Sequence, residues 1–388
     1  MKIFPNQKTA ILSIIADTTK HRMVLDKTLQ IYFKQNPKWG SKDRKTVAQC
    51  SYDIVRNYQL LKQLTPVNQD IIETYIGIIA QYGTIDLEQI AVNHPEIDFA
   101  TLYSIPEDFM TTCNAEMTEA DVELKAMHRI ADIYLRVNVS QIDFDVFCEI
   151  LTSEAIAYEP IRTCTIGSRT FSLHAIKLNQ KLNPNSEFYI RNQVYFEFQD
   201  LGSQIISLMH PVPEKATILE SCAGNGGKST HILDIMPSSS QLISMDIEEK
   251  KLDHLKVRVS RLFNKKIKTE LAIADQIDKY VQKIDVLYMD LPCTGSGTIK
   301  RQPDLKYRIT NEDVLKKALL QRQIIENFDA CLKPQGTLIY STCSIFKSEN
   351  EDQVDWLVSR GYTLVDSLHL LPSQYEGDGF YVAVLKKN

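Results

Sequence analysis

The sequence lacks the features that define several classes of protein. It has no apolar run near the roughly 18 residues that a membrane-spanning helix needs, and Lys2 and Lys8 interrupt its start as no signal peptide would. Its 8 cysteines are scattered without a Cys-x-x-Cys pair, which argues against a zinc site or a disulfide framework. We therefore expect a cytoplasmic protein with reduced cysteines, no metal and no membrane partner.

Charge is unevenly distributed along the chain. The formal net charge is −5, which by itself would count against a nucleic-acid partner. However, residues 20–62 carry ten Lys/Arg against three Asp/Glu, whereas residues 66–124 carry twelve acids and no Lys or Arg. A second basic run, residues 250–268, holds eight Lys/Arg. Because local patches set the field that a polyanion meets, these runs favour nucleic acid as a partner, although solvated helix faces would look the same.

The chain divides into three parts. Apolar residues at helical spacing, such as Val47, Cys50 and Ile54, predict an all-helical domain over residues 1–130, with Ser41 as a helix N-cap. Short alternating segments around one helical stretch predict a small α+β module over residues 131–198. Residues 199–388 alternate strand and helix, which predicts an α/β domain.

Within the α/β domain, five apolar runs read as buried parallel strands. They cover residues 217–220, 242–245, 269–274, 285–290 and 337–342. Ser348 and Glu351 form a capping-box pattern ahead of the last helix, and two further strands follow, residues 362–366 and 380–385. We expect a doubly wound parallel sheet that finishes in a hairpin.

A glycine-rich turn follows the first of these strands and leads into a helix. Glycines at such a turn let the backbone approach a ligand closely. Asp246 ends the second strand, where an acid accepts hydrogen bonds from ribose hydroxyls. A nicotinamide enzyme would use the same device, although no intact Gly-x-Gly-x-x-Gly is present because residue 229 is Ser. Asp275, which we place at the end of the third strand, adds an acceptor for an adenine amine.

Two cysteines follow the ends of the fourth and fifth strands: Cys293 in the run Asp-Leu-Pro-Cys at residues 290–293, and Cys343 in Ser-Thr-Cys-Ser at residues 341–344. Loops after such strands line the ligand crevice of an α/β sheet. Two thiols brought to one crevice, one of them beside the carboxylate of Asp290, indicate covalent chemistry by an activated sulfur. Two structural cysteines that pack as small hydrophobes are the alternative.

The α/β domain resembles the RsmB/Sun-type RNA cytosine-5 methyltransferases. The matching motifs occur in family order at residues 198–204, 222–228, 290–297, 301–306, 340–351 and 378–380. Residues 136–138 resemble the family's small RNA-binding module, and the N-terminus resembles more loosely the NusB-like helical domain of bacterial ribosomal RNA members. The resemblance implies a Rossmann-like domain that uses S-adenosylmethionine to methylate RNA, by analogy 16S ribosomal RNA; we expect a monomer.

The resemblance also implies roles for site residues. Carbon 5 of cytosine accepts a methyl group only after a thiolate adds to carbon 6, and the family assigns this attack to the position of Cys343. Cys293 would serve release, and Asp290 would stabilise charge on the ring. Arg301 and Lys306 would meet RNA phosphates. The implied cofactor residues are Cys222, Ala223, Gly224, Asn225, Gly226, Gly227, Lys228, Asp246, Asp275 and Asp290.

One departure and two alternatives remain. Where the family loop has Cys-Ala-Ala-Pro-Gly-Gly-Lys, this chain has Gly224 and Asn225 in place of the second Ala and the Pro, which predicts a less rigid loop. A DNA cytosine methyltransferase would instead attack with Cys293, but it would leave the Thr-Cys-Ser motif unexplained. A non-catalytic NusB-like RNA-binding factor is the second alternative, against which the intact Asp290, Cys293 and Cys343 count.

Overall fold

The computed structural model describes residues 3–263 and 266–388, and the chain separates into two compact units. The helical unit comprises the chain up to Ile130 together with residues 298–313, and the sheet unit comprises residues 131–297 and 314–388. The expected division into three domains, 1–130, 131–198 and 199–388, remains a prediction. Lys265, part of the second basic run, lies outside the described residues.

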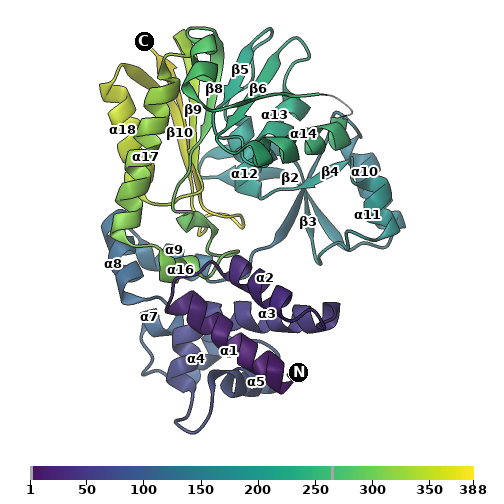
Figure 1. Cartoon of the computed structure of the whole chain (residues 1–388), viewed down its shortest axis with the longest axis vertical. Helices are drawn as coiled ribbons and strands as arrows, with labels where there is room; N and C mark the ends of the chain where they lie inside the picture. Colours follow the sequence, from purple (N-terminus) through teal and green to yellow (C-terminus); the bar gives the residue numbers. More distant parts are fainter. Residues whose placement is uncertain (1–2, 264–265) are drawn as a thin grey trace. The chain divides into compact units, whose positions relative to one another are not determined.

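The described part of the N-terminal region is helical, as predicted (Figure 1). Its helices are α1 (Pro5–Thr19), α2 (Leu25–Gln35), α3 (Ser41–Arg56), α4 (Tyr58–Leu64), α5 (Ile71–Tyr82), α6 (Leu87–Asn93), α7 (Phe99–Leu102), α8 (Glu107–Glu116) and α9 (Ala120–Met127). The predicted core residues Val47, Cys50 and Ile54 are fully buried. The N-cap of α3 is Gly40, not Ser41, because Asp43 accepts a hydrogen bond from the Gly40 amide at 3.0 Å.

A small α+β module opens the sheet unit. It runs β1 (Ile133–Val137), α10 (Phe144–Ser153), β2 (Tyr158–Ile166), β3 (Arg169–Leu178), α11 (Glu187–Asn192) and β4 (Phe196–Phe198). The strands pair antiparallel in the order β2-β3-β1-β4. This β-α-β-β-α-β connection is the ferredoxin-like arrangement.

The large sheet has seven strands in the order β10-β11-β9-β8-β5-β6-β7. The strands are β5 (Thr217–Glu220), β6 (Gln241–Asp246), β7 (Lys268–Leu271), β8 (Ile284–Asp290), β9 (Leu332–Thr342), β10 (Tyr362–Leu370) and β11 (Phe380–Lys387). All neighbouring pairs are parallel except those of β11, which runs antiparallel to both β9 and β10. The predicted doubly wound sheet with a terminal hairpin is confirmed. Strand order reverses at β5, which is where such sheets bind ligands.

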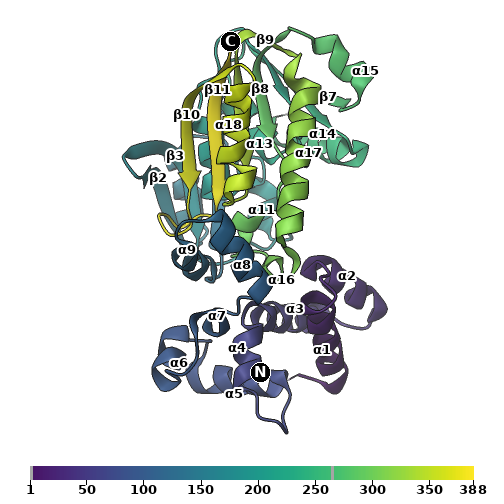
Figure 2. The same cartoon turned by 90° about the vertical axis from the view of Figure 1, so that its left-hand side faces the viewer.

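Helices cover both faces of the large sheet, which explains why its strands are apolar throughout. The connecting helices are α12 (Leu201–Leu208), α13 (Gly227–Ile235), α14 (Glu249–Phe263), α15 (Ala274–Ile277), α17 (Asn311–Asp329) and α18 (Glu351–Ser359). The short helix α16 (Leu305–Arg308) belongs to the helical unit. Short 3₁₀ turns cover Asp278–Tyr280, Ser296–Thr298 and Lys347–Glu349. Helices α17 and α18 lie against one face of the sheet (Figure 2), and α12 and α13 pack on the other.

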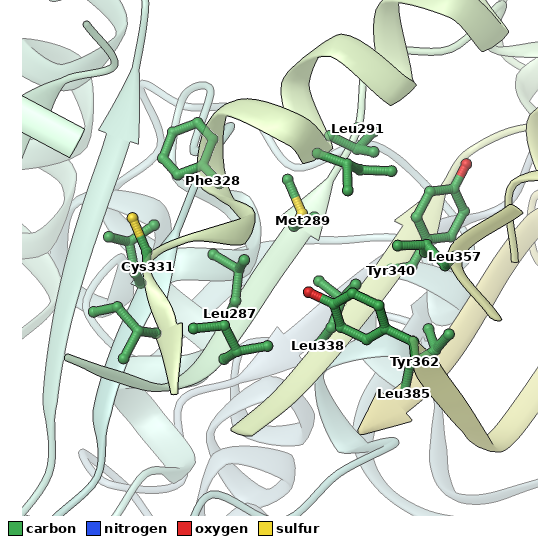
Figure 3. Close-up of a cluster of buried hydrophobic side chains, with 14 of the residues drawn as sticks. Leu287, Met289, Leu291, Phe328, Cys331, Leu338, Tyr340, Leu357, Tyr362 and Leu385 are labelled. Carbon is green, nitrogen blue, oxygen red and sulfur yellow. The ribbon is translucent and has the colours of Figure 1, made fainter. Parts of the chain in front are cut away.

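The core under α17 and α18 is built from strand and helix side chains together. Leu287 and Met289 of β8 meet Tyr340 of β9, Phe328 of α17 and Leu357 of α18 (Figure 3). Each of these five side chains is 3% exposed or less, and burying one stabilises the fold by roughly 1.5–3 kcal/mol. This layer fixes the carboxyl ends of β8 and β9.

Two predicted details of the α/β domain are wrong. Helix α18 is capped by Asn350 and follows a 3₁₀ turn, so Ser348 and Glu351 form no capping box. The third strand ends at Leu271 rather than Ala274, and Asp275 lies in the short helix α15. Within residues 3–263 and 266–388, no helix is both long and apolar enough to cross a membrane.

Candidate active site

The two predicted cysteines meet at the carboxyl edge of the large sheet. Strands β8 and β9 are parallel neighbours, with Asp290 opposite Ser341, so the loops that follow them leave the sheet side by side. The Sγ atoms of Cys293 and Cys343 lie 3.3 Å apart. The structure therefore brings together the thiols that the sequence places 50 residues apart.

Glu349 fixes both cysteine loops. Its buried carboxylate accepts hydrogen bonds from the amide and hydroxyl of Thr294, at 2.7 and 2.6 Å, and from the hydroxyl of Ser344 at 2.5 Å. The Gly297 amide donates to the Cys343 carbonyl at 3.0 Å, which closes the two loops on each other. Glu349 lies within the motif at residues 340–351, but the sequence assigns it no role because Thr294 is distant from it in the chain.

Contact with Cys343 and removal from water both act on the Cys293 thiol. The pKa of Cys293 is raised well above its ordinary value, first by its hydrogen bond with Cys343 and then by its removal from water. Either sulfur can donate the proton in the hydrogen bond between them.

A half-buried ion pair lies beside the thiols. The Nζ of Lys228 lies 2.8 Å from Oδ2 of Asp290, whose other oxygen accepts from the Ser341 hydroxyl at 3.1 Å. Burial lowers the pKa of Lys228, but attraction to Asp290 and to the Cys343 sulfur outweighs it, so the pKa lies above the usual value. Lys228 also sits 5.5 Å from the centre of the Phe380 ring. It therefore remains a cation close to the reacting groups.

The glycine-rich loop between β5 and α13 adopts a conformation that needs its glycines. Gly224 and Gly226 have φ of 55° and 85°, where other residues are strained. A Cβ on Gly226 would lie 2.3 Å from a Leu255 side-chain carbon of α14. The loop is tied to β6 by two backbone donations, from Ala223 to the Met245 carbonyl at 2.8 Å and from Gly224 to Asp246 at 2.9 Å.

The residues of this loop fit an adenosine-type cofactor. Asp246 ends β6 as predicted; its Oδ2 accepts from the Gly224 amide and its Oδ1 from the Glu248 amide, and Lys251 lies 3.8 Å from Oδ1. Since a carboxylate oxygen has more than one lone pair, acceptor capacity is left for ribose hydroxyls. A Cβ added to Gly224 or Gly227 would meet nothing within 4 Å, so there is open space in front of the loop. Burial raises the pKa of Cys222 to about 12, which suits a packing role rather than chemistry.

Asp275 stands apart from the other predicted cofactor residues. It follows the end of β7 by four positions and its side chain is exposed. Its contact with an adenine ring therefore remains a prediction that the fold does not reinforce.

Two of the basic residues that could meet phosphates are buried. Lys306, 3% exposed, donates to the carbonyls of Arg56 and Tyr103 at 2.9 and 3.0 Å, and burial lowers its pKa well below the usual value. Arg56 is 7% exposed and donates to three carbonyls, among them that of Lys300 at 2.7 Å. The expectation that Lys306 binds phosphate is wrong, since it holds residues 298–313 within the helical unit.

Two arginines of the second basic run, residues 250–268, form ion pairs within the sheet unit. Arg258 and Arg261 of α14 both pair with Glu197 of β4, a side chain that is only 5% exposed. Arg136 of β1, from the motif that resembles an RNA-binding module, is 1% exposed and bonds Gln199, Thr230 and Asp234. These arginines join the small module to the large sheet.

The fold, the loop after β5 and the acid that ends β6 have the Rossmann-like arrangement of S-adenosylmethionine-dependent methyltransferases. Residues 206–364 match the family described as 16S rRNA methyltransferase RsmB/F. Ribosomal RNA small subunit methyltransferase B of Shewanella oneidensis is 36% identical over 205 residues, which are 49% of this chain and 47% of that protein. Over this region the chain is similar to the RsmB/Sun-type methyltransferases.

Solved structures show the same fold over more of the chain. The crystal structure of PH0851 has a TM-score of 0.75 at 20% identity and covers 100% of both chains. That of NSun6 from Pyrococcus horikoshii with SFG has a TM-score of 0.60 at 18% identity and covers 73% of this chain and 98% of that one. The chain spans 47% to 62% of the length of the first four curated relatives it matches.

Proposed function

We propose that this protein transfers a methyl group from S-adenosylmethionine to carbon 5 of a cytidine in RNA, with 16S ribosomal RNA as the substrate. The observation that carries the proposal is the pair of sulfurs 3.3 Å apart beside the ion pair of Lys228 and Asp290. Similarity to this family and the rRNA activity named for the curated relatives support the substrate.

The first step is attack by Cys343. Its thiolate adds to carbon 6 of the cytosine, and the electron pair of the 5,6 double bond makes carbon 5 nucleophilic. The cofactor, when bound, supplies the methyl group that carbon 5 takes. Asp290 and the Lys228 cation lie at this edge of the sheet, where they orient the pyrimidine and stabilise the charge that builds on it.

The second step restores the aromatic ring. A base takes the proton from carbon 5, the electrons of that bond re-form the 5,6 double bond, and the Cys343 sulfur is expelled as a thiolate. We assign this release to Cys293, whose sulfur lies against that of Cys343. A DNA-type mechanism would need Cys293 to attack first, and it would leave the second thiol, Cys343, without a role although it lies 3.3 Å away.

In this proposal the helical unit binds the RNA. Of the ten basic residues between positions 20 and 62, seven lysines are exposed and form no ion pair with any described residue: Lys20, Lys27, Lys34, Lys38, Lys42, Lys45 and Lys62. Unpaired cations on one unit create the positive field that attracts phosphates. Two hollows in this region, of about 330 and 290 Å³, combine such lysines with the aromatic rings of Tyr58 and Phe33.

Methylation with labelled S-adenosylmethionine tests the proposal. The protein is incubated with 16S ribosomal RNA, with the same RNA bound in small subunits, and with duplex DNA. Label should enter RNA only, and bisulfite sequencing of RNA from a deletion strain should show one or more cytidines that lose their 5-methyl group. Label in DNA alone, or at a base other than cytosine, would contradict it.

A further inference from the structure

The cofactor loop departs from the family pattern at the two positions where rigidity would come from side chains. With Gly224 and Asn225 in place of Ala and Pro, the loop has no residue that restricts its backbone before Gly226. A flexible loop must be ordered when the cofactor binds, at a cost to affinity. The structure shows contacts from outside the loop that oppose this flexibility.

Helix α14 contacts the loop of residues 222–228 at two neighbouring residues, Gly226 and Asn225. Leu255 packs against Gly226, where a Cβ would clash. One turn further along, Arg258 donates from its guanidinium to the Asn225 carbonyl at 3.1 Å. This hydrogen bond therefore holds the backbone of Asn225, the residue that stands where the family has proline.

Arg258 is itself held in place. Its Nε donates to Oε2 of Glu197 at 2.6 Å, and Glu197 is buried at the end of the small module. A guanidinium has a rigid fork of donors, so a side chain fixed by one acceptor can present its remaining N–H groups in a defined direction. Arg261 pairs with the same carboxylate, but its other donation goes to the Gln193 carbonyl rather than to the loop.

We propose that Arg258 is a positioning residue for the cofactor. Anchored by Glu197, it fixes the Asn225 carbonyl and keeps the loop of residues 222–228 in its binding conformation. The order that proline gives in the family is thus supplied here by a side chain of α14, tied to the small module. This inference rests on the proposed function, because it concerns the S-adenosylmethionine site.

Calorimetry with S-adenosylhomocysteine, without RNA, tests this role apart from catalysis. Arg258→Ala should weaken binding by about 3- to 10-fold, the loss expected for one partly exposed charge-assisted hydrogen bond. Arg261→Ala is the matched control, since it removes a partner of Glu197 without touching the loop, and its affinity should stay within about 2-fold. Arg258→Lys should keep the ion pair and the melting temperature but still lose affinity, because a single ammonium cannot serve both acceptors.

Hydrogen–deuterium exchange gives a second readout on the unliganded protein. Peptides covering residues 222–230 should exchange faster in Arg258→Ala than in the unaltered protein, and not in Arg261→Ala. Equal affinities and equal exchange in the two alanine variants would overturn the inference, leaving Arg258 as a link between α14 and the small module. No binding to the unaltered protein would instead overturn the cofactor assignment on which the inference rests.

Discussion

Replacing each active-site thiol by alanine should give two different failures. Cys343→Ala removes the attacking sulfur, so it should neither methylate RNA nor bond to it. Cys293→Ala keeps the attacking sulfur and loses the group assigned to release. It should therefore methylate once and remain as a covalent protein–RNA adduct.

The structure sets the expected size of the two effects in Cys293→Ala. Removing the sulfur 3.3 Å from Cys343 deletes a hydrogen bond to the attacking group. That loss should slow attack by about 10- to 100-fold, the equivalent of roughly 1.5–3 kcal/mol. Loss of a positioned acid–base group should slow release by about 10²- to 10⁴-fold. Because release loses more than attack, the adduct should accumulate.

Denaturing electrophoresis with labelled RNA measures the adduct directly. A shifted protein band should form in Cys293→Ala with cofactor present and should disappear after nuclease digestion. Cys148→Ala, a half-buried thiol of α10, serves as the control and should behave like the unaltered protein. An adduct in Cys343→Ala with none in Cys293→Ala would reverse the assignment and favour the DNA-type mechanism.

Three further predictions concern the cofactor, RNA docking and pH. Asp246→Ala should weaken S-adenosylmethionine binding by about 1.5–3 kcal/mol in calorimetry, and unchanged affinity in a folded variant would remove Asp246 from the site. Reversing Lys20, Lys45 and Lys62 to Glu should flatten the dependence of log affinity for single-stranded RNA on log salt by about 2, whereas an unchanged slope would make this patch only a solvated face. Burial keeps the pKa of His231 well below its usual value, so only the unfolded state takes up that proton as pH falls below about 6.5. Below that pH, the free energy of unfolding measured with denaturant should fall by about 1.4 kcal/mol per pH unit, and it should fall less in His231→Gln.

Much of the α/β domain could be predicted because its signals are local. The run at residues 285–290 is apolar on both faces of its strand, and it matches β8 (Ile284–Asp290) to within one residue. Once β8 and β9 are placed as parallel neighbours, the meeting of Cys293 and Cys343 follows from the edge at which both strands end. Periodicity and topology together were therefore enough to bring the two thiols together.

Side-chain partners were harder to predict, because they depend on contacts between distant residues. A basic residue looks the same in a sequence whether it faces solvent or a carbonyl. Arg56 and Lys306 lie 250 positions apart, and their hydrogen bond buries both. Arg258 likewise meets Glu197 only after α14 and β4 are packed, so the run at residues 250–268 overstated the free positive surface. Helix caps failed for a related reason: Asp43 bonds Gly40 and moves the start of α3 by one residue from the predicted cap.

Residues 298–313 show why chain order is a poor guide to the units of this protein. They follow directly on the loop that carries Cys293, and the resemblance assigns them to the catalytic domain, yet their contacts are those of the helical unit. Tyr307 donates to the Val55 carbonyl at 3.0 Å, and Lys306 donates to that of the next residue. A buried lysine facing carbonyls is stable only while those carbonyls are in place, because an unpaired buried cation is costly. The helices up to Ile130 are therefore part of what holds the chain beyond the Cys293 loop in a defined conformation, in addition to any surface they present to RNA.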